Sequence, residues 1–316
     1  MNCAITCRCW YFVLLNLLFW QLTVSAEPPE YLVSAQRILF MGDSITHAGH
    51  YVNQLESQFR LQHSGQSPEM INLGLSSETC CGLSEPAHLF PRPNVHERLQ
   101  RALERVRPDV VIVCYGMNDG IYHPFSRQRF TAFQEGVRGM IEKIQNYGAH
   151  LILMSPPPFD PKPLRPTGKL RPLGAEQFAW FAIYEKYDDV LARYACWILQ
   201  QRDEVDMVID LYTPIKDYVE KRRTSDPEFT ASPDGIHPSL EGHRLLAATI
   251  LSAWGMGELQ PIPPAQLKLV AQRQSLLHHA WLSHVGHQRP GVKPGLPLEQ
   301  AIRNAHQIEA SIVLGK

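Results

Sequence analysis

Arg37-Ile38-Leu39-Phe40-Met41-Gly42-Asp43-Ser44 is a short apolar run that ends in a glycine and two polar residues. A run that is apolar on both faces and stops at a glycine is typical of a strand in a parallel sheet, because helices cover both faces of such a sheet. Four more runs of this kind follow along the chain, at residues 70–73, 110–115, 151–154 and 207–211. The sequence therefore predicts a central sheet of five mainly parallel strands.

Helical patterns separate these runs. The clearest is residues 94–107, in which apolar residues recur at spacings of four, four and three and so share one face of a helix. The same pattern predicts helices over residues 127–147, 175–201 and 239–254. Strands that alternate with helices in this way predict an α/β fold, a three-layer α/β/α sandwich with right-handed crossovers.

Residues suited to a chemical role follow the predicted strands. Ser44 follows the first strand, Gly74 the second and Asn118 the third, and a loop after the fifth strand carries Asp234 and His237. In open parallel sheets, ligands bind at the carboxyl ends of the strands. We therefore expect these five residues to share one rim of the sheet.

This set of residues suits nucleophilic catalysis. A serine hydroxyl is a weak nucleophile until a base takes its proton, and His237 is the candidate base for Ser44. Asp234 lies three residues before the histidine, where it can hold the other ring nitrogen and stabilise the imidazolium. The backbone N–H groups of Ser44 and Gly74 and the side-chain amide of Asn118 are the candidate oxyanion hole.

Each of these residues also has a structural interpretation. Ser44 is a suitable helix cap, Asn118 a suitable turn residue and His237 a suitable loop residue. Their occurrence in order, each after a predicted strand, favours the catalytic interpretation. We expect Asp43 to bond loop amides rather than to take part in chemistry, and His47 suits the wall of the site and a structural role equally.

Four short motifs resemble those of the SGNH hydrolases, also called GDSL-type esterases and lipases. They stand in the family's order across roughly residues 36–254, and they are Gly42-Asp43-Ser44, Gly74, Gly116-x-Asn118-Asp119 and Asp234-x-x-His237. The chain has no Gly-x-Ser-x-Gly elbow, which excludes the common α/β-hydrolase arrangement. The resemblance implies a serine esterase that forms an acyl-enzyme on Ser44 and needs no cofactor.

The chain divides into three expected parts. These are a signal peptide at residues 1–26, an SGNH-type hydrolase domain at 27–256 and a helical C-terminal extension at 257–316. The extension shows helical patterns over 265–286 and 297–313. Within the domain, residues 155–174 form a proline-rich loop whose basic residues either flank the active site or form a solvated surface; they are Lys162, Arg165, Lys169 and Arg171.

The N-terminus is typical of an exported protein. An apolar run from Trp10 to Val24 leads into the small residues Ser25 and Ala26, which predicts signal-peptide cleavage after Ala26. The run is about 15 residues long, shorter than the roughly 20 that a membrane anchor needs. No cysteine directly follows it, so we do not expect a lipoprotein. The expected location is secreted or periplasmic, with no stable membrane insertion after cleavage.

After this cleavage four cysteines remain: Cys80, Cys81, Cys114 and Cys196. Neighbouring Cα atoms lie about 3.8 Å apart, too close for a relaxed disulfide between Cys80 and Cys81. Pairing of either one with Cys196 stays open, and Cys114, in an apolar strand, is expected to be buried.

Composition excludes two classes of protein. With 44% hydrophobic and 19% charged residues, the 316-residue chain can bury a large core, which excludes extensive disorder. With 30 Lys and Arg against 31 Asp and Glu, there is no basic excess for binding nucleic acid. We also predict no metal site in the extension, because its histidines lack acidic partners and ligand spacing; they are His278, His279, His284 and His287.

The expected function is hydrolysis of carboxylic esters, most simply acetyl esters of a carbohydrate, because no long amphipathic lid is visible in the sequence. The partner is then a small-molecule or polysaccharide ester. A lysophospholipase or other lipid esterase is the alternative within the same class. A non-catalytic carbohydrate-binding protein is the alternative from another class. The sequence leaves the natural ester, the oligomeric state and the role of the extension open.

Overall fold

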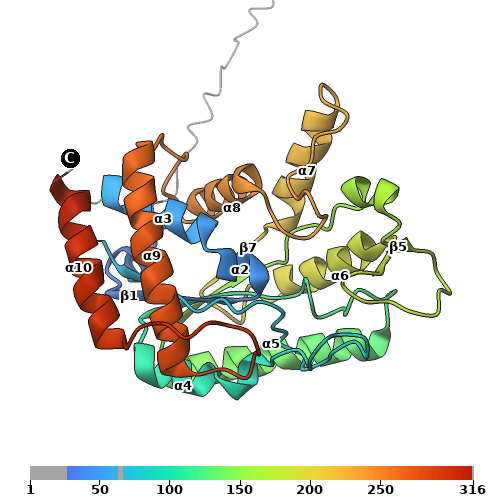
Figure 1. Cartoon of the computed structure of the whole chain (residues 1–316), viewed down its shortest axis with the longest axis horizontal. Helices are drawn as coiled ribbons and strands as arrows, with labels where there is room; N and C mark the ends of the chain where they lie inside the picture. Colours follow the sequence, from blue (N-terminus) through green and yellow to red (C-terminus); the bar gives the residue numbers. More distant parts are fainter. Residues whose placement is uncertain (1–26, 63–66, 315–316) are drawn as a thin grey trace, which may run out of the picture.

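The computed structural model describes residues 27–62 and 67–314. Its centre is a five-stranded sheet with the strand order β2-β1-β3-β4-β7, and all four strand pairs are parallel (Figure 1). The strands are β1 (Arg37–Gly42), β2 (Glu69–Asn72), β3 (Val110–Cys114), β4 (His150–Met154) and β7 (Met207–Ile209). The predicted five-stranded parallel sheet is confirmed.

The register of the sheet aligns the carboxyl ends of its central strands. Gly42 of β1 lies opposite Cys114 of β3, and Cys114 lies opposite Met154 of β4. Every residue of β3 is buried, as expected for a central strand with both faces covered. The segments that follow β1 and β3 therefore leave the sheet side by side.

Helices cover both faces of the sheet (Figure 1). On one face lie α4 (Leu99–Val106), α5 (Arg127–Tyr147) and α6 (Tyr187–Leu199). On the other face lie α2 (Ser44–Ala48), α3 (His50–Gln62) and α8 (Leu240–Ala253). The three-layer α/β/α sandwich predicted from the sequence is confirmed, and α5 spans the predicted residues 127–147.

The helix predicted over 175–201 is wrong in its first half. Only Tyr187–Leu199 is helical, and Ile183–Tyr184 forms the short strand β6, parallel to β5 (Leu170–Arg171). Ile183 N donates to Lys169 O at 2.8 Å and Tyr184 N to Tyr122 O at 3.0 Å. These tertiary hydrogen bonds outweigh the local helical pattern and lay the segment across the rim of the sheet.

Several other elements complete the fold. Helix α7 (Tyr212–Arg223) follows β7 directly, in a stretch for which the sequence predicted only a loop. The shorter elements are α1 (Glu30–Val33) and the 3₁₀ helices η1 (Val95–Glu97) and η2 (Lys162–Thr167). The predicted signal peptide lies outside the described residues. None of the helices within 27–62 and 67–314 combines the length and apolar character needed to cross a membrane.

The C-terminal extension consists of two long helices, α9 (Pro264–Val285) and α10 (Leu298–Leu314), close to the predicted ranges. α9 packs against α3 and the edge strand β2. There Gln274 donates to Met70 O at 2.8 Å and also to the carboxylate of Glu56. Leu277 and Trp281 of α9 belong to the same hydrophobic core as the sheet. The domain boundary after residue 256 stays a prediction.

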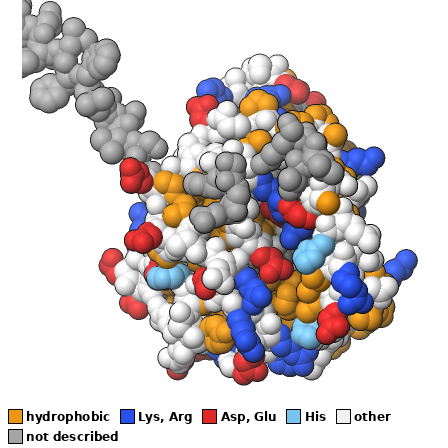
Figure 2. Space-filling view, turned by 90° about the vertical axis from the view of Figure 1, so that its left-hand side faces the viewer, with side chains coloured by type: hydrophobic (Ala, Val, Ile, Leu, Met, Phe, Trp, Pro, Cys, Tyr) orange, Lys and Arg blue, Asp and Glu red, His pale blue; other side chains and the backbone are white. Residues whose placement is uncertain are grey.

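Polar contacts add to this packing. Figure 2 looks onto the side of the molecule that is at the left in Figure 1 and shows acidic and basic side chains interspersed over it. Glu309 of α10 pairs with Arg60 of α3 at 2.5 Å and with Arg273 of α9 at 3.1 Å. One carboxylate thus joins the two helices of the extension to α3, which is far from them in the sequence.

The four cysteines within the described residues are free thiols. Cys80 and Cys114 are buried and Cys196 is exposed, so burial of Cys114 is confirmed.

Candidate active site

Ser44 is the first residue of α2, directly after the carboxyl end of β1. Asp43 caps this helix, because its Oδ1 accepts a hydrogen bond of 2.9 Å from Ile45 N. The structural role expected for Asp43 is confirmed, but the amide that it bonds belongs to the first turn of α2 and not to a loop. The cap fixes the sharp turn from strand to helix and presents the Ser44 hydroxyl at the rim of the sheet.

His237 and Asp234 meet Ser44 from the opposite side of the rim. His237 Nε2 lies 2.9 Å from Ser44 Oγ, and His237 Nδ1 lies 2.7 Å from Asp234 Oδ2. The second carboxylate oxygen of Asp234 accepts from the backbone N–H groups of Ile236 at 3.0 Å and His237 at 2.7 Å. The aspartate is thereby held in the orientation that directs the imidazole toward Ser44.

The electrostatics of this pair suit a general base. Burial lowers the pKa of His237, but the hydrogen bond and charge of Asp234 outweigh it, so that the pKa lies above its ordinary value of 6.5. Burial raises the pKa of Asp234, yet the hydrogen bonds from His237 dominate and hold that pKa at about 2. Asp234 is therefore ionised at neutral pH and stabilises the imidazolium form.

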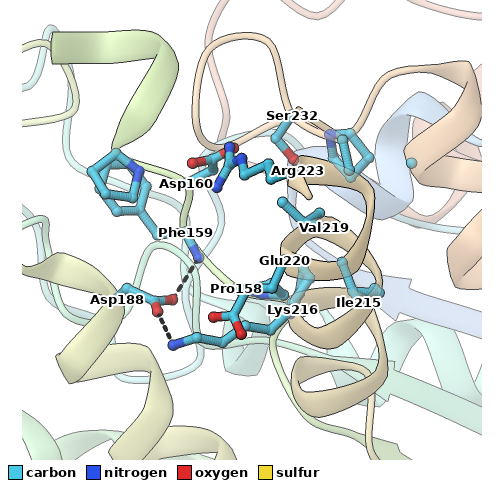
Figure 3. Close-up of a pocket in the computed structure, with 15 residues that line it drawn as sticks. Pro158, Phe159, Asp160, Asp188, Ile215, Lys216, Val219, Glu220, Arg223 and Ser232 are labelled. Atoms are coloured by element: carbon cyan, nitrogen blue, oxygen red, sulfur yellow. Dashed lines mark hydrogen bonds and ion pairs between the residues drawn. The ribbon is translucent and has the colours of Figure 1, made fainter. Parts of the chain in front are cut away.

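The acid–base loop is supported from behind by an ion pair. Asp160 Oδ2 accepts from Arg223 of α7 and from Thr230 Oγ1, both at 2.6 Å. Asp160 N also donates to Gly235 O at 2.9 Å, one residue after Asp234. Figure 3 shows Arg223 reaching toward Asp160 over a cavity of about 180 Å³ beside α7. α7, which the sequence did not predict, thus holds the loop in place.

Asn118 follows β3 and is buried. Its Nδ2 donates to Glu78 O at 3.1 Å, and its Oδ1 accepts from Tyr122 Oη at 2.8 Å. These two bonds fix the orientation of the amide. Because the amide nitrogen carries two hydrogens, one N–H remains for a group in the cavity next to Ser44.

Gly74 does not fit its expected place in the oxyanion hole. Its N–H donates to Asn72 Oδ1 at 2.7 Å, and Gly74 is absent from the wall of the cavity that contains Ser44. A Cβ at Gly74 would lie 2.3 Å from His47 N, so the glycine is needed for the close packing of this loop on α2. The sequence marks Gly74 as a motif residue but does not show which contact requires a glycine there.

Ser77 takes the position that Gly74 was expected to occupy. It lines the cavity together with Ser44 and Asn118. Its backbone is in the left-handed region with φ 69°, and within the described residues neither its N–H nor that of Ser44 has a hydrogen-bond partner. Arg92 Nη1 donates to Ser77 O at 3.2 Å. Nothing in the sequence marks Ser77, because a left-handed conformation is normally signalled by glycine.

The cavity beside Ser44 has a volume of about 310 Å³. Its wall includes Phe90 and Trp180, but none of the basic residues of loop 155–174. Lys162 of that loop pairs instead with Glu228 at 3.1 Å. The structure thus favours the solvated interpretation of the basic loop.

Two histidines considered from the sequence have structural roles. His47 Nδ1 lies 3.1 Å and His278 Nε2 3.0 Å from Gly74 O, and His47 does not line the cavity. Burial lowers the pKa of His278 to about 3, so the imidazole is neutral and donates to the carbonyl. Within the part of the chain that the structure describes, no group of three or more His, Cys, Asp or Glu side chains is arranged to hold a metal ion.

Comparison with known families agrees with this geometry. The model of the GDSL-like lipase/acylhydrolase family matches residues 40–245. The chain belongs to this family. The protein is therefore a hydrolase that acts on ester bonds. A comparison with curated protein sequences gives no match. The match ends before α9, so the C-terminal extension lies outside the family region.

Solved structures share the fold at low sequence identity. One is Axe2, an acetylxylan esterase from Geobacillus stearothermophilus, with a TM-score of 0.52 and 19% identity over 72% of this chain and 97% of that one. Another is the acetyl xylan esterase AlAXEase, with a TM-score of 0.50 and 21% identity over 69% and 98%. BT4096, a gut microbial diltiazem-metabolizing enzyme, has a TM-score of 0.55 and 17% identity over 73% of this chain but only 48% of its own.

The raised pKa of His237 leads to a prediction for the pH dependence of kcat/KM. Activity requires the neutral imidazole, so it should fall as the pH drops through the pKa of His237, with the midpoint above 6.5. Asp234→Asn removes the charge that raises this pKa. We expect the midpoint to move to lower pH and the rate to fall by roughly two to four orders of magnitude. The profile is measured with p-nitrophenyl acetate.

Asp43 provides the control for this experiment, because burial raises its pKa to about 7, into the same range. Asp43→Asn keeps an oxygen that can accept from Ile45 N but cannot titrate. An acid limb that persists in Asp43→Asn belongs to His237, whereas its disappearance would assign the limb to Asp43.

The left-handed backbone of Ser77 predicts that a glycine substitution has opposite effects on stability at Ser77 and at its neighbour Ser76. Ser77→Gly should retain activity and raise the free energy of unfolding by up to about 1 kcal/mol, because glycine adopts positive φ without a steric penalty. Ser77→Val should lower both the activity and the free energy of unfolding, because a β-branched residue is strained at positive φ. Ser76, which has no positive φ, is the matched control. Ser76→Gly should destabilise, and stabilisation by both glycines in urea unfolding would contradict the assignment.

Proposed function

We propose that this protein is an exported serine esterase that removes acetyl groups from carbohydrates without a cofactor. The observation that carries the proposal is the chain of hydrogen bonds from Asp234 through His237 to Ser44, 2.7 and 2.9 Å long. It ends at a cavity of about 310 Å³ that is open to substrate. Export is proposed from the apolar N-terminal run and the small residues at its end.

The first half of the reaction forms the acyl-enzyme. Ser44 Oγ attacks the acetyl carbonyl carbon while His237 Nε2 takes the hydroxyl proton. The carbonyl oxygen becomes an oxyanion, to which Ser44 N, Ser77 N and Asn118 Nδ2 are the available donors. When the tetrahedral intermediate collapses, the bond to the sugar oxygen breaks and His237 returns its proton to that oxygen.

The second half releases acetate. A water molecule enters the space left by the alcohol, and His237 takes its proton as the water oxygen attacks the acetyl carbon. The same donors hold the second oxyanion. Collapse then breaks the bond to Ser44 Oγ, which regains a proton from His237, so the enzyme ends the cycle unchanged.

A small acyl group and a polar alcohol are supported by the walls of the site. On one side the loop Ser76–Ser77 and the amide of Asn118 bound the cavity with polar groups. Phe90 and Trp180 line it as well, and Trp180 has 44% of its surface exposed. Exposed aromatic rings of this kind combine apolar contact area with access to solvent. Two of the similar solved structures are acetyl xylan esterases. A lipid esterase is the alternative.

Replacement of the nucleophile tests the catalytic assignment. Ser44→Ala should remove p-nitrophenyl acetate hydrolysis, a loss of roughly 10⁶-fold in kcat by analogy with serine hydrolases, with no change in the unfolding midpoint. A fluorophosphonate should label the wild type at Ser44 alone. Retained activity in Ser44→Ala would refute the assignment of the nucleophile, whereas a wild type without activity would support a non-catalytic binding protein.

Acyl-chain length tests the acetyl preference. We expect kcat/KM to fall from acetyl to butyryl to octanoyl p-nitrophenyl esters, because we propose that the acyl group lies against the polar groups of Ser77 and Asn118 and that the apolar part of the wall, with Phe90 and Trp180, contacts the alcohol. A lipid esterase should instead gain affinity with each buried methylene, about 0.8 kcal/mol per group. A steady rise toward octanoyl would replace the carbohydrate assignment with the lipid one.

A further inference from the structure

Arg289 of the C-terminal extension lines the same cavity as the proposed nucleophile Ser44. It lies in the loop between α9 and α10, outside the residues 40–245 that match the family. Its Nε donates to Ser76 O at 2.8 Å and its Nη1 to Pro290 O at 2.9 Å. The guanidinium lies 5.3 Å from the centre of the Phe90 ring. The extension therefore supplies part of the site wall.

The charge of Arg289 is not neutralised by the protein. The other arginine in the cavity wall, Arg92, is bound by both carboxylate oxygens of Glu85 at 2.6 and 2.7 Å. Arg289 has no ion pair with any described residue, and its Nη2 has no hydrogen-bond partner on a described acidic group. Partial burial lowers the pKa of Arg289, which is the expected effect on a cation that lacks a counter-charge.

The wall of the cavity contains no acidic side chain among the described residues, but it contains two arginines and two histidines. One of these histidines is His237, whose partner Asp234 lies behind it, away from the cavity wall. A cavity with an uncompensated cation and no carboxylate of its own favours a ligand that brings one. The planar guanidinium matches a carboxylate better than any other common side chain does.

We propose that Arg289 is a specificity-determining residue that binds a carboxylate on the alcohol part of the substrate. This inference rests on the proposed function, because an acetyl group carries no carboxylate of its own. The carboxylate must then belong to the sugar. The substrate class is an O-acetylated uronic acid, either free or within an acidic polysaccharide.

Arg289 also touches the peptide that carries the Ser77 N–H. In a trans peptide the C=O and N–H point in opposite directions, so a bond from Arg289 to Ser76 O helps to orient the Ser77 N–H. A purely positioning role would affect all esters alike. Loss of carboxylate binding would lower the activity on acidic esters only. An acidic substrate and its neutral analogue therefore separate the two roles.

The test compares an O-acetylated methyl glucuronide with its neutral carboxamide, by acetate release at pH 8. We expect wild-type kcat/KM to favour the acid by about tenfold or more, the value of one charge-assisted hydrogen bond. Arg289→Gln should remove this preference, and Arg289→Lys should keep part of it. In wild type the KM for the acid, but not for the amide, should rise with added NaCl.

Arg303→Gln is the matched control, because Arg303 is an exposed arginine on α10 of the same extension and should leave the preference unchanged. An equal loss on both substrates in Arg289→Gln would overturn carboxylate binding and leave only positioning. A wild type without preference or salt effect would overturn it even if the variants fail to fold. In either case Ser44-dependent acetate release from the carboxamide shows that the proposed function still holds, whereas its absence would refute that function.

Discussion

The register between β1 and β3 is the constraint on which the site depends. It places Gly42 opposite Cys114, so the turn that carries Ser44 and the turn that carries Asn118 start from the same level of the sheet. A slip of one residue would turn every side chain of β1 to the other face. Five of the six residues of β1 are buried, so such a slip would disrupt the packing on both faces of the strand. Burial of the strands thus sets the separation of the proposed nucleophile and one oxyanion donor.

A buried ion pair then fixes the remaining wall. Glu78 and Arg98 have fully buried side chains and are joined by bonds of 2.6 and 2.7 Å. Arg98 also donates to Leu73 O at 2.7 Å, and Glu78 O accepts from Asn118. Burying two charges costs desolvation energy that their attraction barely repays. The pair is therefore better explained as a device that gives the Leu73–Glu78 loop a single geometry than as a source of stability.

The sequence predicted what local patterns encode. Apolar runs that stop at glycine located the strands, and polar residues after them located Ser44 and His237, which the structure brings to 2.9 Å. It failed where tertiary contacts decide. The segment before Tyr187 is held by backbone hydrogen bonds to residues distant in the sequence. Ser77 has a positive φ, which its residue type does not indicate. The catalytic roles remain predictions that rest on this geometry.

The C-terminal extension shows why the family region alone does not determine the site. α9 is held against the sheet through Gln274 on Met70 O and His278 on Gly74 O. Both acceptors lie on or directly after β2, the strand that leads into the Ser76–Ser77 loop. Arg289, one loop further along the chain, reaches the same loop at Ser76 O. The cation and the loop are thus aligned by a common support, so changes in how α9 packs should alter the choice of substrate as well as the stability of the fold.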